Sequence, residues 1–372
     1  MVVHARRGQV LAYRLAAHEL SRPDDGAPPA VLGLGVQDTP PGSAALALAA
    51  RRAPDAAAST AKDPAVTLAW SVRGAPHLHR TADLARVAAA VWPLDDADAE
   101  SRLATSGRTI KKAGVAGLDA FRLTAEAMHA VVTRPMPKGE VSAAVTARVP
   151  DALAFDCKPC GARHIYGSLF QAAALAGGVR LERGGGSTAL APIPGWADTP
   201  PRAADPEPLI MAYLTLMGPS PREAVAAFLS VKPAALAKVW PDGLVEARVD
   251  GAQTWLPEGA VAALESAEPR KLVRLLPPGD PYLQARDREL LLPDEDRRRL
   301  MWRAINSPGA VLADGEIVGI WQGKAAGAKA VDVAVTGFAA LSRTIRAAIE
   351  TEAQTVAAVR GVPEARVRHA DA

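Results

Sequence analysis

The sequence predicts an α+β fold of repeated helix–turn–helix units, each followed by a β-hairpin. Segments with apolar residues at helical spacing alternate with breaks rich in Gly and Pro, and short alternating strands follow them. Asp-Gly turns at 250–251 and 314–315 mark two of the hairpins. The order helix, turn, helix, hairpin recurs along the chain, and this recurrence predicts tandem units.

Composition limits the class of protein. The chain has 372 residues and is 49% hydrophobic, which is enough for two or three compact units with cores of their own. No apolar run reaches the ~20 residues that a membrane-spanning helix needs, and the N-terminus lacks the apolar segment of a signal peptide. We therefore expect a cytoplasmic protein with no membrane partner. The net charge is only +3, so a nucleic-acid partner requires the basic residues to gather on one surface.

The first unit is predicted over residues 1–97. Its expected elements are a helix at 6–20, a loop at 21–30, an apolar strand or turn at 31–36, an Ala-rich helix from Ser43 to about Arg52, a strand at 65–72, and a helix from Thr81 or Asp83 to Pro93. The Ser43 hydroxyl is a candidate N-cap for the Ala-rich helix.

The second unit is predicted over 98–197 and is followed by a linker near 198–206. Its expected elements are a helical group at 98–133, a break at 135–139, a short helix at 139–149, a helix at 162–177, and a hairpin that turns at Gly184-Gly185-Gly186. Helix, turn, helix, hairpin is the order of a winged helix.

The third unit is predicted over 207–268, and a β-rich unit with a terminal helix over 269–372. Their expected elements are helices at 207–217, 221–229 and 232–239, hairpins at 243–256 and 310–321, a strand at 331–338, a helix at 339–359, and a frayed tail at 363–372. Ser220 is a candidate cap for the second of these helices.

Five segments resemble the AlkZ/YcaQ-like family of winged-helix DNA glycosylases. They are LGLGVQDTPPGSAALALAARR, SVRGAPHLHRTADL, FDCKPCGARHIYGSLFQAAALAGG, YLTLMGPSPREAVAAFL, and RLLPPGDPYLQARDRELLLP with VLADGEIVGIW. The resemblance implies tandem winged-helix units with a small C-terminal β-barrel-like unit. It also implies a monofunctional glycosylase that removes alkylated purines from double-stranded DNA, acting as a monomer and without a cofactor.

The family's catalytic motif, Gln-hydrophobic-Gln or Gln-hydrophobic-Asp, is only half present. Aligned on LGLGVQDTPP, its second position falls on Gln37, and its first falls on Gly35, which has no side chain. A purine alkylated at N7 already carries positive charge, so the protein needs only to hold a water at C1′ and stabilise an oxocarbenium-like transition state. The Gln37 amide can hold such a water, and Asp38 could add a negative charge. The alternative is structural: Asp38 caps the following helix and Gln37 bonds the backbone.

Basic side chains supply the candidate contacts to DNA. Arg73, His77, His79 and Arg80 surround a Gly-Ala-Pro turn and could contact phosphate, or they could form a polar turn that faces water. Arg163 and His164, near the start of the helix predicted at 162–177, could also face DNA. The arginines at 286–303 are interspersed with acids, which is typical of a solvated, salt-bridged helix face.

Cys157, Cys160 and His164 have a spacing that occurs in zinc sites. A structural zinc needs a fourth ligand, and the sequence has no second pair of cysteines, so we expect a reduced thiol pair and no metal. The resemblance to the AlkZ/YcaQ-like family implies a DNA glycosylase. Two alternatives stay open: a non-catalytic DNA-binding or regulatory protein of the same fold, and a protein-interaction scaffold.

Overall fold

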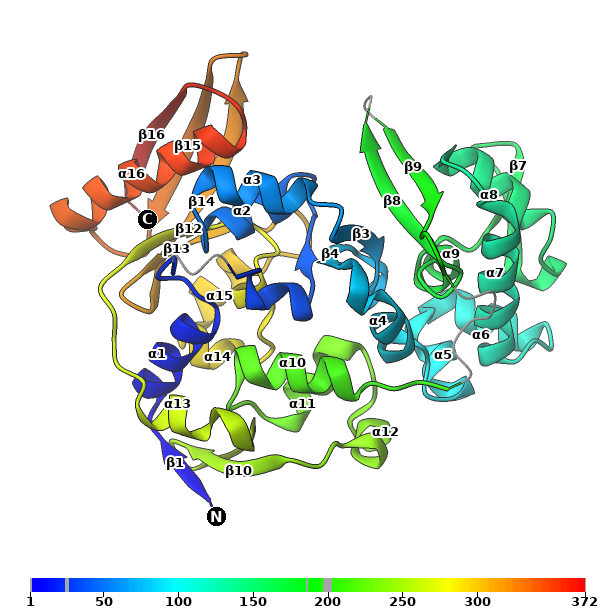
Figure 1. Ribbon diagram of the computed structural model, residues 1–372, viewed down its shortest axis with the longest axis horizontal. Helices are drawn as coiled ribbons and strands as arrows, with labels where there is room; N and C mark the ends of the chain where they lie inside the picture. Colours follow the sequence, from blue (N-terminus) through cyan, green and yellow to red (C-terminus); the bar gives the residue numbers. More distant parts are fainter. Residues whose placement is uncertain (1, 24–26, 185–186, 197–202, 372) are drawn as a thin grey trace. The chain divides into compact units, whose positions relative to one another are not determined.

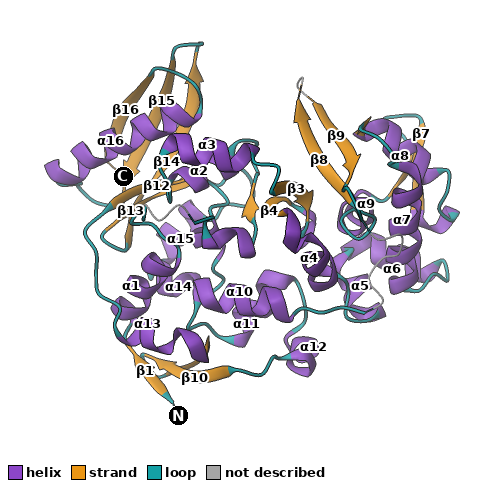
Figure 2. Ribbon diagram, in the orientation of Figure 1, coloured by secondary structure: helices purple, strands orange, loops and turns teal. Residues whose placement is uncertain are grey.

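The computed structural model describes residues 2–23, 27–184, 187–196 and 203–371, and it has a mixed α+β architecture (Figures 1 and 2). The chain divides into two compact units. The first comprises Met1–Asp63, Met211–Val225 and Pro241–Ala372, and the second comprises Pro64–Ile210 and Ala226–Trp240. Within the described residues, no helix is long and apolar enough to cross a membrane.

The N-terminal and central parts of the first unit surround a small three-stranded sheet. Their elements are β1 (Val3–Ala5), α1 (Arg7–Ala17), η1 (Ala30–Gly33), β2 (Val36–Gln37), α2 (Ser43–Ala49), α3 (Pro54–Lys62), β10 (Leu244–Val249), β11 (Ala252–Pro257), η6 (Glu258–Ala260) and α13 (Val261–Glu265). Strand β1 runs parallel to β10, which forms a hairpin with β11. The predicted Asp250-Gly251 turn is confirmed, because both residues adopt positive φ, 47° and 89°.

The C-terminal part of the first unit is a five-stranded sheet with one long helix against it. Its elements are β12 (Val273–Leu276), η7 (Pro281–Gln284), α14 (Arg288–Leu291), α15 (Glu295–Met301), β13 (Gly309–Ala313), β14 (Glu316–Ala326), β15 (Ala330–Gly337), α16 (Arg343–Val359) and β16 (Glu364–Asp371). The strand order is β12-β13-β14-β15-β16. Apolar residues of α16, among them Ile349 and Val356, share a core with the buried strand residues Val311, Trp321 and Val333.

Two expectations for this part are wrong. Among the described strands, β12 and β16 lie at opposite edges and do not pair, so the sheet is open and the expected barrel-like closure does not form. Residues 364–371 are not a frayed tail, because they form β16, which pairs in parallel with β15. Ala365 and Val367 pack into the core on one face of this strand, and that burial holds the end of the chain in the sheet.

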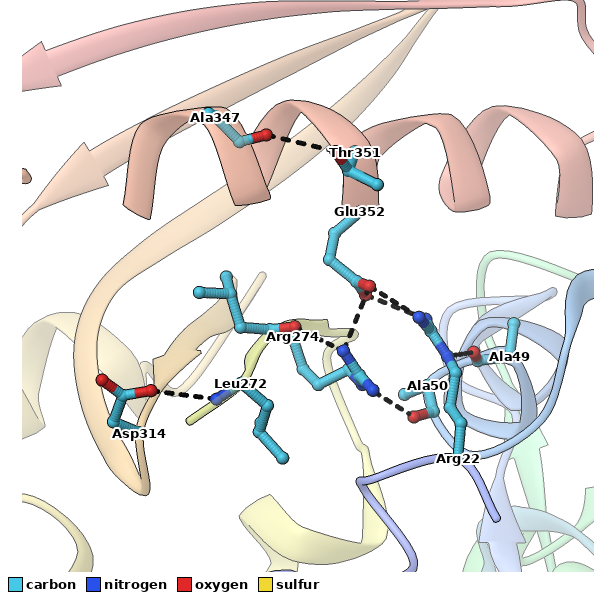
Figure 3. A network of polar contacts seen from close by, with 10 residues as sticks. Arg22, Ala49, Ala50, Leu272, Arg274, Asp314, Ala347, Thr351 and Glu352 are labelled. Atoms are coloured by element: carbon cyan, nitrogen blue, oxygen red, sulfur yellow. Dashed lines mark hydrogen bonds and ion pairs between the residues drawn. The ribbon is translucent and has the colours of Figure 1, made fainter. Parts of the chain in front are cut away.

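A partly buried network of charges connects α16 to the rest of the first unit (Figure 3). The Glu352 carboxylate accepts hydrogen bonds from Arg22 at 2.6 and 2.9 Å and from Arg274 at 3.3 Å. Arg22 also donates to the carbonyl oxygen of Ala49, and Arg274 donates to that of Ala50. The end of α2, strand β12 and helix α16 therefore meet at one carboxylate.

The second unit combines a helical core with short hairpins. Its elements are β3 (Val66–Trp70), η2 (Val72–Gly74), β4 (Pro76–Arg80), η3 (Thr81–Asp83), α4 (Leu84–Val91), α5 (Asp96–Arg102), α6 (Ala104–Lys112), α7 (Gly117–Val131), β5 (Met136–Pro137), α8 (Lys138–Thr146), η4 (Asp151–Leu153), β6 (Ala154–Cys157), β7 (Ala162–Ile165), α9 (Gly167–Ala173), β8 (Val179–Gly184), β9 (Ser187–Pro192), α12 (Pro233–Leu236) and η5 (Ala237–Val239). Two further helices, α10 (Glu207–Met217) and α11 (Arg222–Leu229), each cross from one unit to the other.

Most predicted elements of the second unit are confirmed, with one correction. The strand expected at 65–72, the helices at 98–133 and the hairpin of β8 and β9 are present. Part of the predicted Gly184-Gly185-Gly186 turn and part of the linker lie outside the described residues. The helix expected at 162–177 is shorter and begins at Gly167, because residues 162–165 pair with 154–157 as a hairpin. Gly161, at φ 61°, provides the turn between these strands.

Candidate active site and nucleic-acid contacts

Gln37 is the last residue of β2, in the first unit, and its side chain is partly exposed. The residues before it, Val31, Leu32, Leu34 and Val36, are all buried, and they hold the segment in the core. Gly35 has φ 97°, a conformation that glycine adopts readily and that strains other residues. The first position of the family motif therefore has no side chain, and its backbone conformation is unfavourable for a glutamine.

Asp38 is buried and caps the helix that follows it. Its Oδ1 accepts hydrogen bonds from the backbone N–H of Gly42 at 2.7 Å and from that of Ala44 at 3.1 Å. The expected role of Ser43 is wrong, because Ser43 is the first residue of α2 and its N-cap position is Gly42, which has no side chain. A carboxylate at this end of a helix satisfies free N–H groups and is stabilised by the helix dipole. The structural role that the sequence left open for Asp38 is thus present.

The loop after β12 lies against the Gln37 side chain. A Cβ atom placed on Gly279 would lie 3.4 Å from Cδ of Gln37, 3.5 Å from its Nε2 and 3.3 Å from the carbonyl oxygen of Thr39. Gly279 has φ 77°, so glycine is favoured here by the backbone as well as by the space. The absence of a side chain lets the loop approach the Gln37 amide closely.

Asp280, the residue after Gly279, forms a wholly buried ion pair with Arg51, which lies two residues after the end of α2. The Arg51 guanidinium donates to both oxygens of Asp280 at 2.9 Å, and Asp280 also accepts from the backbone N–H of Tyr282. Arg51 also lies 3.2 Å from Nδ1 of His18. Burial, reinforced by Arg51 and Arg14, lowers the pKa of His18 well below its usual value, so the ring is neutral and can accept from the guanidinium.

A second arginine–aspartate ion pair, Arg14 with Asp287, also joins the N-terminal part of the first unit to the segment after β12. Arg14, which is wholly buried, donates to both carboxylate oxygens of Asp287, and it also donates to the carbonyl oxygen of Pro219. Ser220 donates to the same carboxylate. Sequence analysis missed Gly279, Asp280 and Asp287. The one available signal was the segment RLLPPGDPYLQARDRELLLP, which carried the resemblance without a role for any of its residues.

His77 and His79 lie inside the second unit, on β4. They are 2% and 0% exposed, and the Ser71 hydroxyl lies 3.1 Å from Nδ1 of His77 and 2.9 Å from Nε2 of His79. His77 Nδ1 also donates to the carbonyl oxygen of Ala75. Burial, reinforced by His79 and Arg73, lowers the pKa of His77 well below its usual value. A neutral, buried ring offers no charge to phosphate, so the geometry favours a role in fixing the β3–β4 hairpin.

The arginines beside these histidines are more accessible. Arg73 is exposed, and it donates to the backbone carbonyl oxygen of Phe228 at 2.9 Å. Its guanidinium lies 5.2 Å from the centre of the Phe228 ring. Arg80 has a side chain that is 35% exposed, and it lies 3.6 Å from Asp83. Both can reach solvent from the second unit, whereas Gln37 and Asp38 belong to the first.

Arg163 and His164 lie on strand β7 and not at the start of a helix. Arg163 is 40% exposed and pairs with Asp156 at 3.3 Å and Asp151 at 3.5 Å. His164 lies close to Cys157 and Cys160, with one potential metal-binding atom of each residue within 4.8 Å of the others. The three residues that the sequence singled out for zinc are therefore brought together.

The basic cluster at 286–303 has two parts. Arg297 and Arg299 form the predicted surface ion pairs, Arg299 with Glu295 and Asp296 and Arg297 with Asp294. Arg298 pairs with Glu289 but is only 19% exposed. Arg286 and Arg288 are partly buried, and together with Arg298 and Arg299 they line a cavity of about 830 Å³ in the first unit. Burial lowers the pKa of both guanidinium groups, that of Arg288 to about 10, and Arg288 lies 4.9 Å from the centre of the Trp302 ring.

The fold and the sequence together define the class of protein. Residues 31–359 match the family described as "DNA glycosylase AlkZ-like", so the chain belongs to the AlkZ-like DNA glycosylase family. Membership supports a function in DNA repair with DNA as the substrate.

Among solved structures, the chain is similar to the DNA glycosylase AlkZ of Streptomyces sahachiroi, with a TM-score of 0.76 and 24% sequence identity. The alignment covers 99% of this chain and 100% of that one, so the two share their fold over the whole length. None of the curated proteins compared with the chain matches it.

Proposed function

We propose that this protein is a monofunctional DNA glycosylase that excises alkylated purines from double-stranded DNA. The observation that carries the proposal is the partly exposed Gln37, which directly precedes the capping residue Asp38 and lies beside the loop of Gly279. An amide at this position, in a member of a DNA glycosylase family, is suited to orienting a water molecule.

Removal of an N7-alkylated purine does not require the protein to supply a general acid. An N7-alkylated purine leaves without protonation, so the sugar develops an oxocarbenium-like charge as the N-glycosidic bond breaks. The amide oxygen of Gln37 can accept a hydrogen bond from the attacking water, and the amide N–H can donate one. Asp38 serves as a positioning residue, because its Oδ1 already accepts two backbone N–H groups.

We also propose that DNA is held without sequence selectivity, by a monomer built of tandem winged-helix units. Arg73, Arg80 and Arg163 are the candidate phosphate contacts, because each keeps its guanidinium accessible. His77 and His79 would act indirectly, by fixing the hairpin that carries the first two arginines. Such contacts would anchor the duplex and weaken steeply as the salt concentration rises.

The test is single-turnover base release from a duplex that contains N7-methylguanine. We expect Gln37→Ala to reduce the rate about 10²-fold, the scale of losing a group that positions a reactant, while DNA affinity at fixed salt stays within about twofold of wild type. Equal rates for the variant and wild type would refute the role of Gln37. Asp38→Asn keeps the capping oxygen and removes the charge, so it should retain most of the rate; a loss as large as that of Gln37→Ala would make the carboxylate part of the chemistry.

A second candidate function follows from Gly35. With one motif position lacking a side chain and a backbone unsuited to glutamine, a non-catalytic DNA-binding protein is the specific alternative. It predicts salt-dependent duplex binding by the wild-type protein without base release from N7-methylguanine or from a bulkier N7 adduct.

A further inference from the structure

The hairpin of β6 and β7 brings two thiols and one imidazole together at its turn. Cys157 is the last residue of β6, Cys160 lies in the turn, and His164 is on β7. One potential ligand atom from each lies within 4.8 Å of the other two. Across the described part of the chain, no other group of three or more His, Cys, Asp or Glu residues has this geometry.

The register of the hairpin explains why these residues meet. Cys157 pairs directly with Ala162, and His164 is two residues further along the same strand. Side chains two residues apart on a strand share a face, so Cys157 and His164 are diagonal neighbours on one face of the hairpin. The backbone N–H of Gly161 donates to the carbonyl oxygen of Cys157 at 2.9 Å and closes the turn that carries Cys160.

The end of the hairpin that carries the turn is largely exposed. A two-stranded hairpin is marginally stable by itself in water. Here only the end formed by Ala154 and Ile165 is buried, whereas Phe155 is 40% exposed and Cys160 is exposed. The ion pairs of Arg163 lie on the surface, where such pairs contribute little. The Phe155 ring stacks on Tyr166 at 5.4 Å and lies 6.3 Å from the His164 ring, so these contacts stabilise the strands, whereas the turn that carries Cys160 lies beyond them.

We propose that Cys157, Cys160 and His164 bind one Zn²⁺ ion, with water as the fourth ligand. Thiolate and imidazole are the ligands that zinc prefers, and Zn–S bonds of about 2.3 Å place two thiolates about 3.8 Å apart in a tetrahedral site. That spacing fits inside the observed limit of 4.8 Å. Two thiolates also balance the charge of the ion.

The state of the side chains agrees with this assignment. The two cysteines are free thiols and not a disulfide. Nε2 of His164 is buried, and among the described residues it has no hydrogen-bond partner. Binding releases a proton from each thiol and places the ion where it joins the turn to β7. The proposal does not depend on glycosylase activity.

The first experiment measures metal content in the full-length protein. The protein is purified with a reductant and without chelator, and zinc is quantified by mass spectrometry. We expect one zinc ion per chain, its loss in Cys157→Ser and Cys160→Ser, and at least tenfold weaker binding in His164→Ala. His4→Ala is the matched control, since His4 is exposed on β1, in the other unit; this variant should keep its zinc.

A second experiment uses the wild-type protein and is independent of whether the variants fold. After removal of zinc, Co²⁺ is added and the absorption spectrum is recorded. A thiolate-to-cobalt charge-transfer band in the near ultraviolet, with the intense visible bands of tetrahedral cobalt, is the expected result. Wild-type protein without zinc that gives no such band, zinc that persists in the double variant Cys157→Ser/Cys160→Ser, or a Cys157–Cys160 disulfide in the freshly purified protein would overturn the proposal.

Discussion

Replacing Gly279 by alanine tests how closely the position of the Gln37 amide controls activity. The new Cβ would lie 3.3 Å from the carbonyl oxygen of Thr39 and 3.4 Å from Cδ of Gln37, so these neighbours must shift by a few tenths of an ångström. The backbone at Gly279 cannot easily shift to avoid this contact, because the following residue, Asp280, is held by its buried ion pair with Arg51.

The magnitude follows from two separate effects. Alanine in the left-handed conformation costs about 1–2 kcal/mol of stability, since Gly279 has φ 77°. A misplacement of about 1 Å in a reacting group costs about 10²-fold in rate, so a shift of a few tenths of an ångström should cost about three- to fivefold. Binding of DNA should be unchanged, because no phosphate contact is altered.

Gly251→Ala is the matched control for the backbone effect. Gly251 has φ 89°, and a Cβ there would meet no atom within 4 Å. Both variants should therefore lose similar stability in urea, but only Gly279→Ala should lose single-turnover rate on the N7-methylguanine duplex. Equal rates for Gly279→Ala and wild type, or equal losses in the two variants, would refute the reasoning.

Three further predictions concern stability, measured as the free energy of unfolding in urea. Asp38→Ala should cost about 0.5–2 kcal/mol, because α2 loses its cap, whereas Asp38→Asn should cost much less; equal costs would contradict the capping role. Asp280→Asn should cost about 3–5 kcal/mol, because it leaves a guanidinium buried without its charge partner. Glu295→Gln, in an exposed ion pair, should cost under about 1 kcal/mol. Similar costs for Asp280→Asn and Glu295→Gln would contradict the claim that burial determines the cost. Lowering the pH below about 6.5 should destabilise the protein by up to about 1.4 kcal/mol per pH unit for each of His18 and His77. Their pKa values are depressed in the folded state, so the unfolded chain binds protons first; His18→Asn and His77→Asn should each flatten this dependence.

Local chemistry predicted several elements correctly. The two Asp-Gly turns adopt the positive φ values that two-residue hairpins need, and the alternation at 66–70 forms a strand. The two main errors have one cause. Residues 162–165 are a strand because they pair with 154–157, and residues 364–371 because they pair with 330–337. The periodicity of a short segment does not show which distant segment it will pair with.

The candidate site was accessible to sequence reasoning only in part. The position of Gln37, at the start of an Ala-rich helix and in a segment resembling the family motif, identified it as a candidate. The burial of His77 and His79 could not be predicted from the sequence. A His-Leu-His segment beside a turn has the same sequence pattern whether its rings face water or contact a buried serine. The sequence offered both Asp38 and Ser43 as caps of α2, and only the structure showed that Asp38 accepts the backbone N–H groups.

By itself, the sequence determined the α+β class, the turns, most helices and the family resemblance, because propensity, periodicity and turn chemistry act over a few neighbouring residues. Only the tertiary structure decided that Gly279 lies against Gln37, that Arg51 pairs with Asp280, and that His164 meets the two cysteines. These contacts depend on which buried faces pack together and on strand register. Both arise from interactions between distant segments, whose side chains carry no local sign of the partner that they will meet.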